Sequence, residues 1–376
     1  MKHYRLTGIL ALSMGLSCLM PAVSLAEGPG DLIGQQEGTE VSQESEQPKD
    51  PNDISLKESS NPIVKVAGKY SYEQMAGDIS RLQSRYGGRM RVGSFGTSLD
   101  GRALYEITIG NPGASKHVMI QAGIHGREHM TPLLVMKQLE TALEFWDTAN
   151  YEGQPISSML DQVQVHFLPM VNPDGVSVSQ QGLMGLHSYD LQQIIKEGHG
   201  KDMEESRTAT PFELYLPYCK GNGRGVDLNV NFPAKWEQIT TSPGHASYTG
   251  YKGEKPGSEP ESAGLMKLAD SRSWSASVSY HSRGEVIYWD FDGNKVKEQS
   301  RELAKVFAEQ TGYQILGANG KGGFKDWMQI KENPVPSITV ETGTAECPMP
   351  VSEWPRVWSK NRSGWAAALY YAWTHG

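Results

Sequence analysis

From Ile63 to the end of the chain, segments with strand patterning alternate with segments with helix patterning, and this alternation limits the fold more than any other feature. Strands that are joined through helices favour a parallel sheet with helices packed on both faces. The sequence therefore predicts an α/β fold with a mostly parallel sheet between helical layers. No repeat of fixed period is present, which argues against a propeller or a helical array.

The expected strands are short apolar runs between turn residues, at 104–109, 117–122, 163–169, 277–280, 285–289 and 337–341. The expected helices have apolar residues at helical spacing, at 71–86, 131–146, 260–271, 295–311 and 353–373. Ser71 can cap the first helix, and Pro132 stands in the first turn of the second, where its missing N–H costs little. Residues 182–220 fit neither pattern, and we interpret them as a long excursion of the kind that often shapes a site.

The first 62 residues are expected to lie outside the folded domain. Lys2 and Arg5 precede an apolar run, and small residues follow at Ser24 and Ala26, so residues 1–26 are predicted to be a secretory signal peptide. An uncleaved N-terminal anchor is the alternative. Residues 27–62 hold nine acids, two bases and few large apolar residues, which predicts an acidic disordered linker or pro-segment. The catalytic domain is then expected at 63–376, in a secreted or wall-associated monomer with no membrane span after cleavage.

The net charge bears on possible partners of the chain, and the number of cysteines bears on a possible disulfide. The formal net charge is −8, and most of it falls in the acidic linker, so we expect no nucleic-acid partner. Signal removal would leave two cysteines, Cys219 and Cys347. An even number in an exported protein favours a disulfide between them, and two buried thiols are the alternative.

His125 and Glu128 carry the strongest chemical signal, because they stand three residues apart in a turn between an expected strand and an expected helix. An imidazole and a carboxylate at this spacing can bind one metal ion, and together they suit zinc. His281 is the best third ligand and Glu341 the best general base. Each ends an expected strand, where α/β sheets place their sites. Any one of these residues alone is more often incidental, and their joint placement favours a metal site.

A second interpretation of the same segment uses His129. The spacing from His125 to His129 also matches the pattern His-x-x-Glu-His, in which both histidines bind zinc and the glutamate is the base. That pattern belongs inside a helix. Gly126 and the following Thr131-Pro132 place this segment in a turn instead, which favours the ligand set with His281.

Together with two further motifs in the same order, the ligand candidates and Glu341 resemble the zinc metallocarboxypeptidase family. The motifs that carry the resemblance are Asn172-Pro173-Asp174-Gly175, Gly225-Val226-Asp227-Leu228-Asn229, His281-Ser282 and Glu341-Thr342-Gly343. The resemblance covers about residues 68–376. It implies one α/β domain with a mixed eight-stranded sheet. It also implies one Zn²⁺ per chain held by His125, Glu128 and His281, with Glu341 as the base. Lys220, the nearest counterpart of a family arginine, would stabilise the oxyanion.

The chain departs from the family where family members bind the substrate's terminal carboxylate. The family reads Asn-Arg-Asn after Asp-Leu, whereas this chain has Asn229-Val230-Asn231, and valine cannot pair with a carboxylate. A mobile tyrosine of the family is also missing from 315–320. With these departures and the run 281–289, the chain resembles the bacterial branch of γ-D-glutamyl-meso-diaminopimelate peptidases. The resemblance implies a bacterial enzyme whose substrate is the peptidoglycan stem peptide.

Four residues are candidates for substrate binding: Asn229, Arg127, Arg283 and Lys325. By resemblance, Lys325 stands at the base of the pocket for the residue after the cut. A cation there would favour the carboxylate of diaminopimelate over a lysine side chain. In the alternative, Lys325 points to solvent and Asp326 neutralises it.

Two other functions remain open at this stage. The chain could be a metallocarboxypeptidase that removes C-terminal residues from peptides, with Arg127, Arg224 or Arg283 in place of the missing arginine. It could also be a non-catalytic wall-binding module with a vestigial site, although all three ligands and the base are present.

Overall fold

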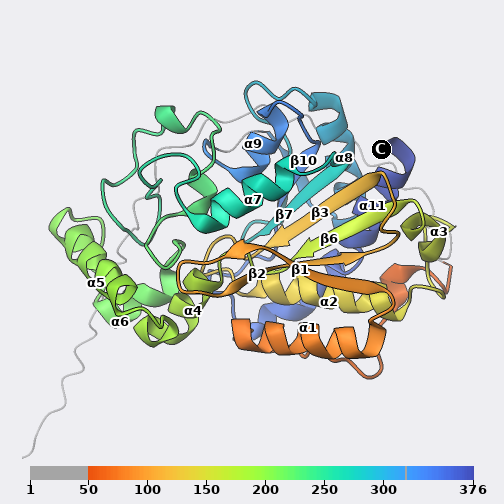
Figure 1. Ribbon diagram of the computed structural model, residues 1–376, viewed down its shortest axis with the longest axis horizontal. Coiled ribbons are helices and arrows are strands. Elements are labelled where there is room, and N and C mark those ends of the chain that lie inside the picture. The colour runs from red at the N-terminus through yellow and green to blue at the C-terminus, as the bar shows by residue number, and fades with distance from the viewer. Residues whose placement is uncertain (1–49, 318–319) are drawn as a thin grey trace, which may run out of the picture. The chain divides into compact units, whose positions relative to one another are not determined.

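The computed structural model describes residues 50–317 and 320–376 (Figure 1). At its centre lies a mixed sheet of eight strands in the order β1-β2-β6-β3-β7-β10-β8-β9. The inner strands β6, β3, β7 and β10 run parallel to one another, while β1–β2, β2–β6 and β10–β8 are antiparallel. The strands are β1 Met90–Thr97, β2 Ala103–Ile109, β3 Lys116–Ala122, β6 Val163–Leu168, β7 Ala276–His281, β8 Val286–Tyr288, β9 Gln314–Leu316 and β10 Ser337–Glu341.

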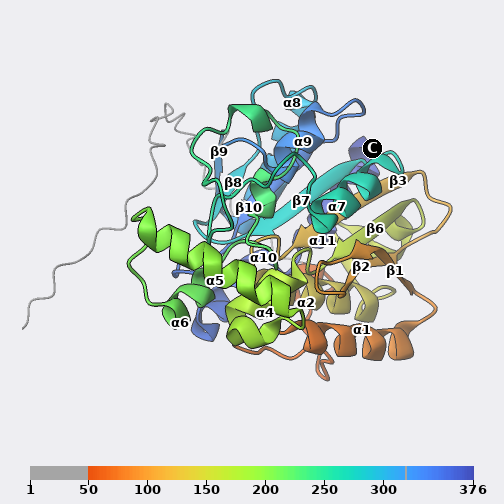
Figure 2. The same ribbon diagram turned by 60° about the vertical axis from the view of Figure 1, so that its left-hand side comes forward.

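Helices cover both faces of the sheet, as Figures 1 and 2 show. Helices α1, α2, α8, α10 and α11 join the core on one face, and α7 and α9 join a second core on the other. The α/β fold and the mixed eight-stranded sheet are therefore confirmed. The helices are α1 Tyr72–Tyr86, α2 Met130–Glu144, α3 Ile156–Leu160, α4 Pro173–Gln181, α5 Tyr189–Glu204, α6 Phe212–Tyr215, α7 Pro260–Asp270, α8 Lys297–Thr311, α9 Phe324–Ile330, α10 Trp354–Asn361 and α11 Gly364–His375.

The alternation of side chains along β7 decides what each face of the sheet can do. Val278 and Tyr280 belong to the larger core, which α2 and α11 cover. Successive side chains of a strand point to opposite faces, so Ser277, Ser279 and His281 face the other side. One face of the sheet therefore builds the core, and the other presents polar side chains.

Most expected elements are present, with shifted ends. Ser71 caps α1 through a capping box with Gln74, as the sequence predicts. The single helix expected at 353–373 is instead two helices, α10 and α11. The excursion 182–220 is largely helical, and α5 packs there over a small core of its own that includes Leu191 and Ile195. Strands β1 and β9 and the short helix α9 were not expected.

Part of the expected acidic linker packs on the domain. Ile54 is buried in the main core. Asp53 forms a bridge with Asn150 in the short hairpin of β4 (Asn150–Tyr151) and β5 (Gln154–Pro155). Residues 1–49, which include the expected signal peptide, lie outside the described residues. Within the described residues, no helix is both long enough and apolar enough to cross a membrane.

Candidate active site

The three expected metal ligands meet at the carboxyl ends of β3 and β7. The Nδ1 atoms of His125 and His281 lie 3.3 Å apart. The Glu128 carboxylate lies 2.7 Å from Nδ1 of His125 and 3.3 Å from Nδ1 of His281. All three residues are buried, and in the described part of the chain they form the one group of three or more possible metal ligands whose ligand atoms all lie within 4.8 Å of one another.

This geometry suits zinc. Zinc–nitrogen bonds of about 2.0–2.1 Å at tetrahedral angles place two ligand nitrogens roughly 3.3–3.4 Å apart. The separation of the two Nδ1 atoms, 3.3 Å, agrees with that value. Two imidazoles and one carboxylate also leave a fourth position open, which is the pattern of catalytic zinc sites. The residues therefore fit a catalytic zinc ion.

Asp227 orients His125, a role that the sequence did not reveal. One of its carboxylate oxygens lies 3.3 Å from Nε2 of His125, and the other accepts a hydrogen bond from the backbone N–H of Gly250 at 3.1 Å. Burial alone would raise the pKa of Asp227, but His125 holds it well below its usual range. A carboxylate on the second ring nitrogen fixes the tautomer and the orientation of a ligand histidine.

The ligand cluster favours positive charge. Burial would lower the pKa of His125, but the carboxylates of Glu128 and Asp227 raise it to about 9. The backbone N–H of Ser282 also donates to Glu128, at 3.1 Å, which holds the carboxylate toward the two histidines. A cation between these side chains is therefore stabilised by two buried carboxylates.

Glu341 lies beside the cluster without belonging to it. It ends β10, and the parallel register with β7 sets it directly next to His281, on the same face of the sheet. Burial raises the pKa of Glu341, and Glu128 adds to the effect, while His281 and Lys220 oppose it. An acid in this position can take and return a proton without occupying the metal.

Lys220 reaches the same site from the end of the excursion. Its charge acts on Glu341, His125 and Asp227. Its backbone is held by the Asn172 amide, which donates to the carbonyls of Lys220 at 3.3 Å and Ile124 at 3.0 Å. Asn172 therefore ties the segment that carries Lys220 to the segment that carries the ligands.

Two glycines allow these segments to touch. A Cβ on Gly126 would lie 2.5 Å from the carbonyl oxygen of Gly175, and a Cβ on Gly175 would lie 2.3 Å from the carbonyl oxygen of Gly221. Both distances are too short for any side chain. The three segments consequently pack backbone against backbone, and this contact requires glycine.

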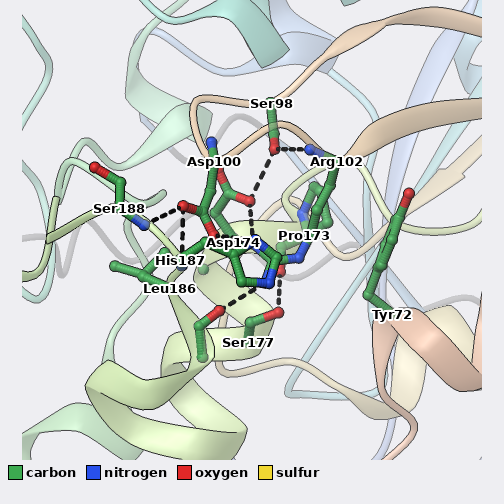
Figure 3. A network of polar contacts seen from close by, with 12 residues as sticks. Tyr72, Ser98, Asp100, Arg102, Pro173, Asp174, Ser177, Leu186, His187 and Ser188 are labelled. Carbon is green, nitrogen blue, oxygen red and sulfur yellow. Dashed lines mark hydrogen bonds and ion pairs between the residues drawn. The ribbon is translucent and has the colours of Figure 1, made fainter.

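A buried ionic network anchors the Asn172–Gly175 motif (Figure 3). Asp174 accepts hydrogen bonds from Ser98 and from the Arg102 guanidinium, both at 2.8 Å. Arg102 also pairs with Asp100 at 2.6 Å, and the carboxylate of Asp100 accepts the backbone N–H of Ser188. The network joins the β1–β2 turn, the start of α4 and the excursion, and it thereby fixes the position of Asn172.

The zinc carboxypeptidase family matches residues 75–364 of the chain. This chain belongs to that family. It is therefore a zinc metallopeptidase, a hydrolase of peptide bonds. A relative named gamma-D-glutamyl-L-diamino acid endopeptidase 1, from Lysinibacillus sphaericus, is 30% identical over 311 residues, which cover 82% of this chain and 74% of the relative.

Solved carboxypeptidases share the fold. Thrombin activatable fibrinolysis inhibitor superposes with a TM-score of 0.62 at 18% identity, over 84% of this chain and 78% of that one. Carboxypeptidase A from Helicoverpa armigera gives a TM-score of 0.61 at 19% identity, over 85% of this chain and 77% of that one. At these identities the likeness shows the fold alone.

His129 takes no part in the ligand set of this zinc carboxypeptidase. Its Nε2 lies 2.8 Å from the hydroxyl of Ser179, and burial lowers its pKa to about 4. The alternative pattern with two histidines from one segment is therefore not formed. The third ligand comes from β7, more than 150 residues later in the chain.

The four residues expected to bind substrate differ in the contacts that they already make within the protein. The side-chain oxygen of Asn229 accepts the backbone N–H of Phe324 at 3.2 Å, where it caps α9. Lys325 is only 3% exposed; its ammonium donates to the carbonyl of Asp290 at 2.6 Å and pairs with Asp326 at 2.5 Å. The alternative that placed Lys325 in solvent is wrong, but Asp326 does neutralise its charge.

The three candidate arginines also differ in whether their guanidinium groups already have a partner. Arg283 pairs with Glu346 at the surface, and Arg224 pairs with Glu259 at 3.0 Å. Arg127 is half-buried next to Glu128, and its Nε is buried with no hydrogen-bond partner in the described residues. Arg127 is therefore the arginine of the three that retains unused donor capacity near the ligands.

The expected disulfide is wrong, because Cys219 and Cys347 are both free and buried. The thiol of Cys219 contacts the carbonyl of Tyr215 in its own segment at 3.7 Å, and the thiol of Cys347 contacts the carbonyl of Ser282, which follows β7, at 3.8 Å. The charge of Arg127 acts on both thiols. Both cysteines therefore border the site without being bonded to each other.

Proposed function

We propose that this peptidase hydrolyses the bond between γ-linked D-glutamate and a diamino acid, such as meso-diaminopimelate, in peptidoglycan stem peptides. The observation that carries the proposal is Val230, which stands where carboxypeptidases of the family bind the terminal carboxylate with arginine. Arg224 and Arg283, which could replace that arginine, are already paired with acids. The name of the Lysinibacillus sphaericus relative supports the same substrate class.

Arg127 has a role in this proposal. D-Glutamate that is linked through its γ-carboxyl keeps a free α-carboxylate on the near side of the cleaved bond. Arg127 directly precedes the ligand Glu128 and has an unpartnered Nε. Its guanidinium would bind that α-carboxylate and orient the γ-amide toward the ligands.

The chemistry follows from the arrangement of the side chains. When bound, zinc would lower the pKa of its water and polarise the scissile carbonyl. His125, Glu128 and His281 would hold one ion per chain, with Asp227 fixing the ring of His125. Glu341 would take the proton of the water and return it to the leaving amine. Lys220 would place positive charge against the developing oxyanion.

We further propose that the protein is exported from a bacterial cell as a monomer. Residues 1–26 would be the signal peptide, and cleavage would follow Ala26. N-terminal sequencing of the protein recovered from the culture medium or the cell wall tests this proposal. A mature chain that begins at Glu27 is expected, and an intact N-terminus in the membrane fraction would contradict it.

The decisive experiment is mass spectrometry of the products from defined stem peptides. Wild type is expected to cleave between D-glutamate and diaminopimelate, and Glu341→Gln is expected to lose turnover while zinc remains bound. Glu332→Gln, at an exposed acid before β10, is the matched control. Removal of C-terminal residues alone would indicate a carboxypeptidase. Zinc binding without any turnover in wild type would indicate a binding module.

A further inference from the structure

Three exposed apolar side chains lie on the excursion, and the mechanism above does not use them. Met184 is 83% exposed, Leu214 is 61% exposed and Tyr218 is 49% exposed. Met184 belongs to the 3-10 helix Gly182–Gly185, which contacts the 3-10 helix Leu216–Tyr218. Helix α6, which carries Leu214, runs directly into the second of these helices. We call these three side chains the apolar surface.

The apolar surface lies outside the small core of the excursion. Tyr215, Leu216 and Cys219, from the same stretch of chain, are buried in that core. Leu214 and Tyr218 alternate with these residues and remain exposed. Figures 1 and 2 show α4, α5 and α6 together at one end of the domain. Exposed apolar side chains that gather on one surface commonly mark a site of interaction.

The chain that leaves the apolar surface runs beside the turn that carries Arg127. The backbone N–H of Gly126 donates to the carbonyl of Lys220 at 2.9 Å. The charge of Arg127 acts on the thiol of Cys219. Tyr218 directly precedes Cys219, so it stands at the edge of the site on the side of Arg127.

A second contact holds the same chain from the side of α4. The hydroxyl of Ser179 donates to the carbonyl of Pro217 at 2.6 Å, and the same hydroxyl lies 2.8 Å from Nε2 of His129. His129 directly follows the ligand Glu128. The backbone on both sides of Tyr218 is therefore fixed to the segment that holds the ligands.

The order of the strands decides which part of a substrate reaches this side. Strand β3, which leads into the ligand turn, and strand β10, which ends in Glu341, lie on opposite sides of β7. The leaving residue lies against Glu341, because Glu341 returns its proton to the leaving amine. The residue before the cleaved bond, and the chain that precedes it, therefore lie toward Arg127 and Tyr218. This direction rests on the proposed function.

In peptidoglycan, little chain precedes the D-glutamate of a stem peptide. One amino acid and one lactyl group join it to N-acetylmuramic acid, which is a sugar of the glycan strand. Two units of this size span roughly 7 Å when extended. With the D-glutamate held by Arg127, the sugar reaches the edge of the site where Tyr218 stands.

We propose that the apolar surface binds the glycan strand to which the stem peptide is attached, with a sugar ring stacked on Tyr218. Sugar rings present faces of C–H groups, which pack on the face of an aromatic ring. The hydroxyl of a tyrosine at the edge of that ring can bond to the hydroxyls of the sugar. The enzyme then favours stem peptides that are still attached to glycan over free peptides.

The charge of the excursion favours a sugar over an anionic partner. Residues 182–219 hold six acids and three bases. A surface with an excess of negative charge repels anionic lipid headgroups and phosphate polymers. The N-acetylated sugars of a glycan strand are neutral where they carry stem peptides, and they meet no such repulsion.

The test compares two substrates that differ only before the D-glutamate. One is L-alanyl-γ-D-glutamyl-meso-diaminopimelate, and the other carries N-acetylglucosaminyl-N-acetylmuramic acid on its L-alanine. Wild type is expected to favour the second substrate in kcat/KM. Tyr218→Ala is expected to reduce this preference by roughly three- to tenfold, whereas Tyr218→Trp, which keeps an aromatic face, is expected to retain it. Equal kcat/KM for both substrates in wild type, or an unchanged preference in Tyr218→Ala, would overturn the inference.

Leu214→Ala is expected to reduce the same preference, and Leu56→Ala is its matched control. Leu56 is also exposed, but it lies in the 3-10 helix Ile54–Leu56, which contacts β4. Strand β4 follows the C-terminal end of α2, whereas the ligand turn precedes its N-terminal end, roughly 20 Å away along the helix. An equal loss of preference in Leu56→Ala and Leu214→Ala would contradict the assignment.

A binding measurement keeps the inference separate from the proposed function. The neutral tetramer of N-acetylglucosamine is titrated into zinc-loaded wild type and Tyr218→Ala, and wild type is expected to bind it more tightly. If wild type cleaves no γ-D-glutamyl peptide, the proposed function fails, and this titration still tests the apolar surface. Dimers of wild type that Tyr218→Ala dissociates, without any binding of sugar, would assign the surface to a second copy of the chain and overturn the inference.

Discussion

Glu261, on the first turn of α7, tests whether burial keeps a carboxyl group protonated in the folded protein. It is 0% exposed, and its carboxyl accepts a hydrogen bond from the amide of Asn222 at 3.1 Å. Burial, and then the charge of Asp174, raise the pKa of Glu261 to about 8. The carboxyl of Glu261 is therefore expected to hold a proton in the folded protein at neutral pH.

The size of the change in the free energy of unfolding follows from the linkage between protonation and folding. The ordinary pKa is 4.5 and the folded pKa is about 8, so the folded chain retains a proton that the unfolded chain releases between these values. At about 1.36 kcal/mol per pH unit, the loss of stability across this window is on the order of 4–5 kcal/mol. The contribution of Glu261 is fully present below pH 4.5 and is lost as the pH rises through about 8.

Glu261→Gln removes the titration and keeps the oxygen that accepts from Asn222. Urea unfolding of both proteins is expected to show a stability difference that grows in favour of the variant by about 1.4 kcal/mol per pH unit between the two pKa values and levels off above the folded one. Glu254→Gln, at an exposed carboxylate, controls for the change of charge alone. A difference between Glu261→Gln and wild type that does not vary with pH would refute the reasoning.

Three further outcomes are expected. Asp227→Asn should weaken zinc binding by roughly 10- to 100-fold, measured by competition with a chelator, because the ring of His125 loses its orienting carboxylate. Removal of zinc by a chelator should lower the Tm, and re-addition should restore it, because the ion binds only the folded ligand set. Denatured, unreduced mature protein should titrate as two thiols per chain. In the native state Cys347 should react slowly, because burial raises its pKa to about 12.

The sequence was sufficient for the ligands because their signals are local. His125 and Glu128 share one turn, and His281 and Glu341 each end an apolar run that reads as a buried strand. Parallel strands bring such ends to one edge of a sheet, so local patterns were enough to place all four together. Local patterns were not enough to identify the carboxylate that orients His125. Asp227 lies about 100 residues away in a turn, and its contact with the ring depends on packing that no local pattern encodes.

The misjudged features are those that depend on side-chain direction. The even number of cysteines favoured a bond between Cys219 and Cys347, but the thiol of Cys219 contacts the carbonyl of Tyr215 and the thiol of Cys347 contacts the carbonyl of Ser282. The resemblance placed Lys325 at a pocket, whereas Asp326 and Asp290 satisfy its charge before any substrate arrives.

The two faces of the sheet explain how one domain can be stable and still carry unsatisfied polar groups. On one face, alternate residues of β3, β7 and β10 join the larger core with α2 and α11. The intervening residues place Gln121, Ser279 and His281 on the opposite face, where several buried polar atoms have no partner. Because side chains alternate strictly along a strand, a one-residue shift of register would exchange the two sets. The large apolar core therefore fixes the register, and the register in turn holds the ligand His281 and the base Glu341 on one surface.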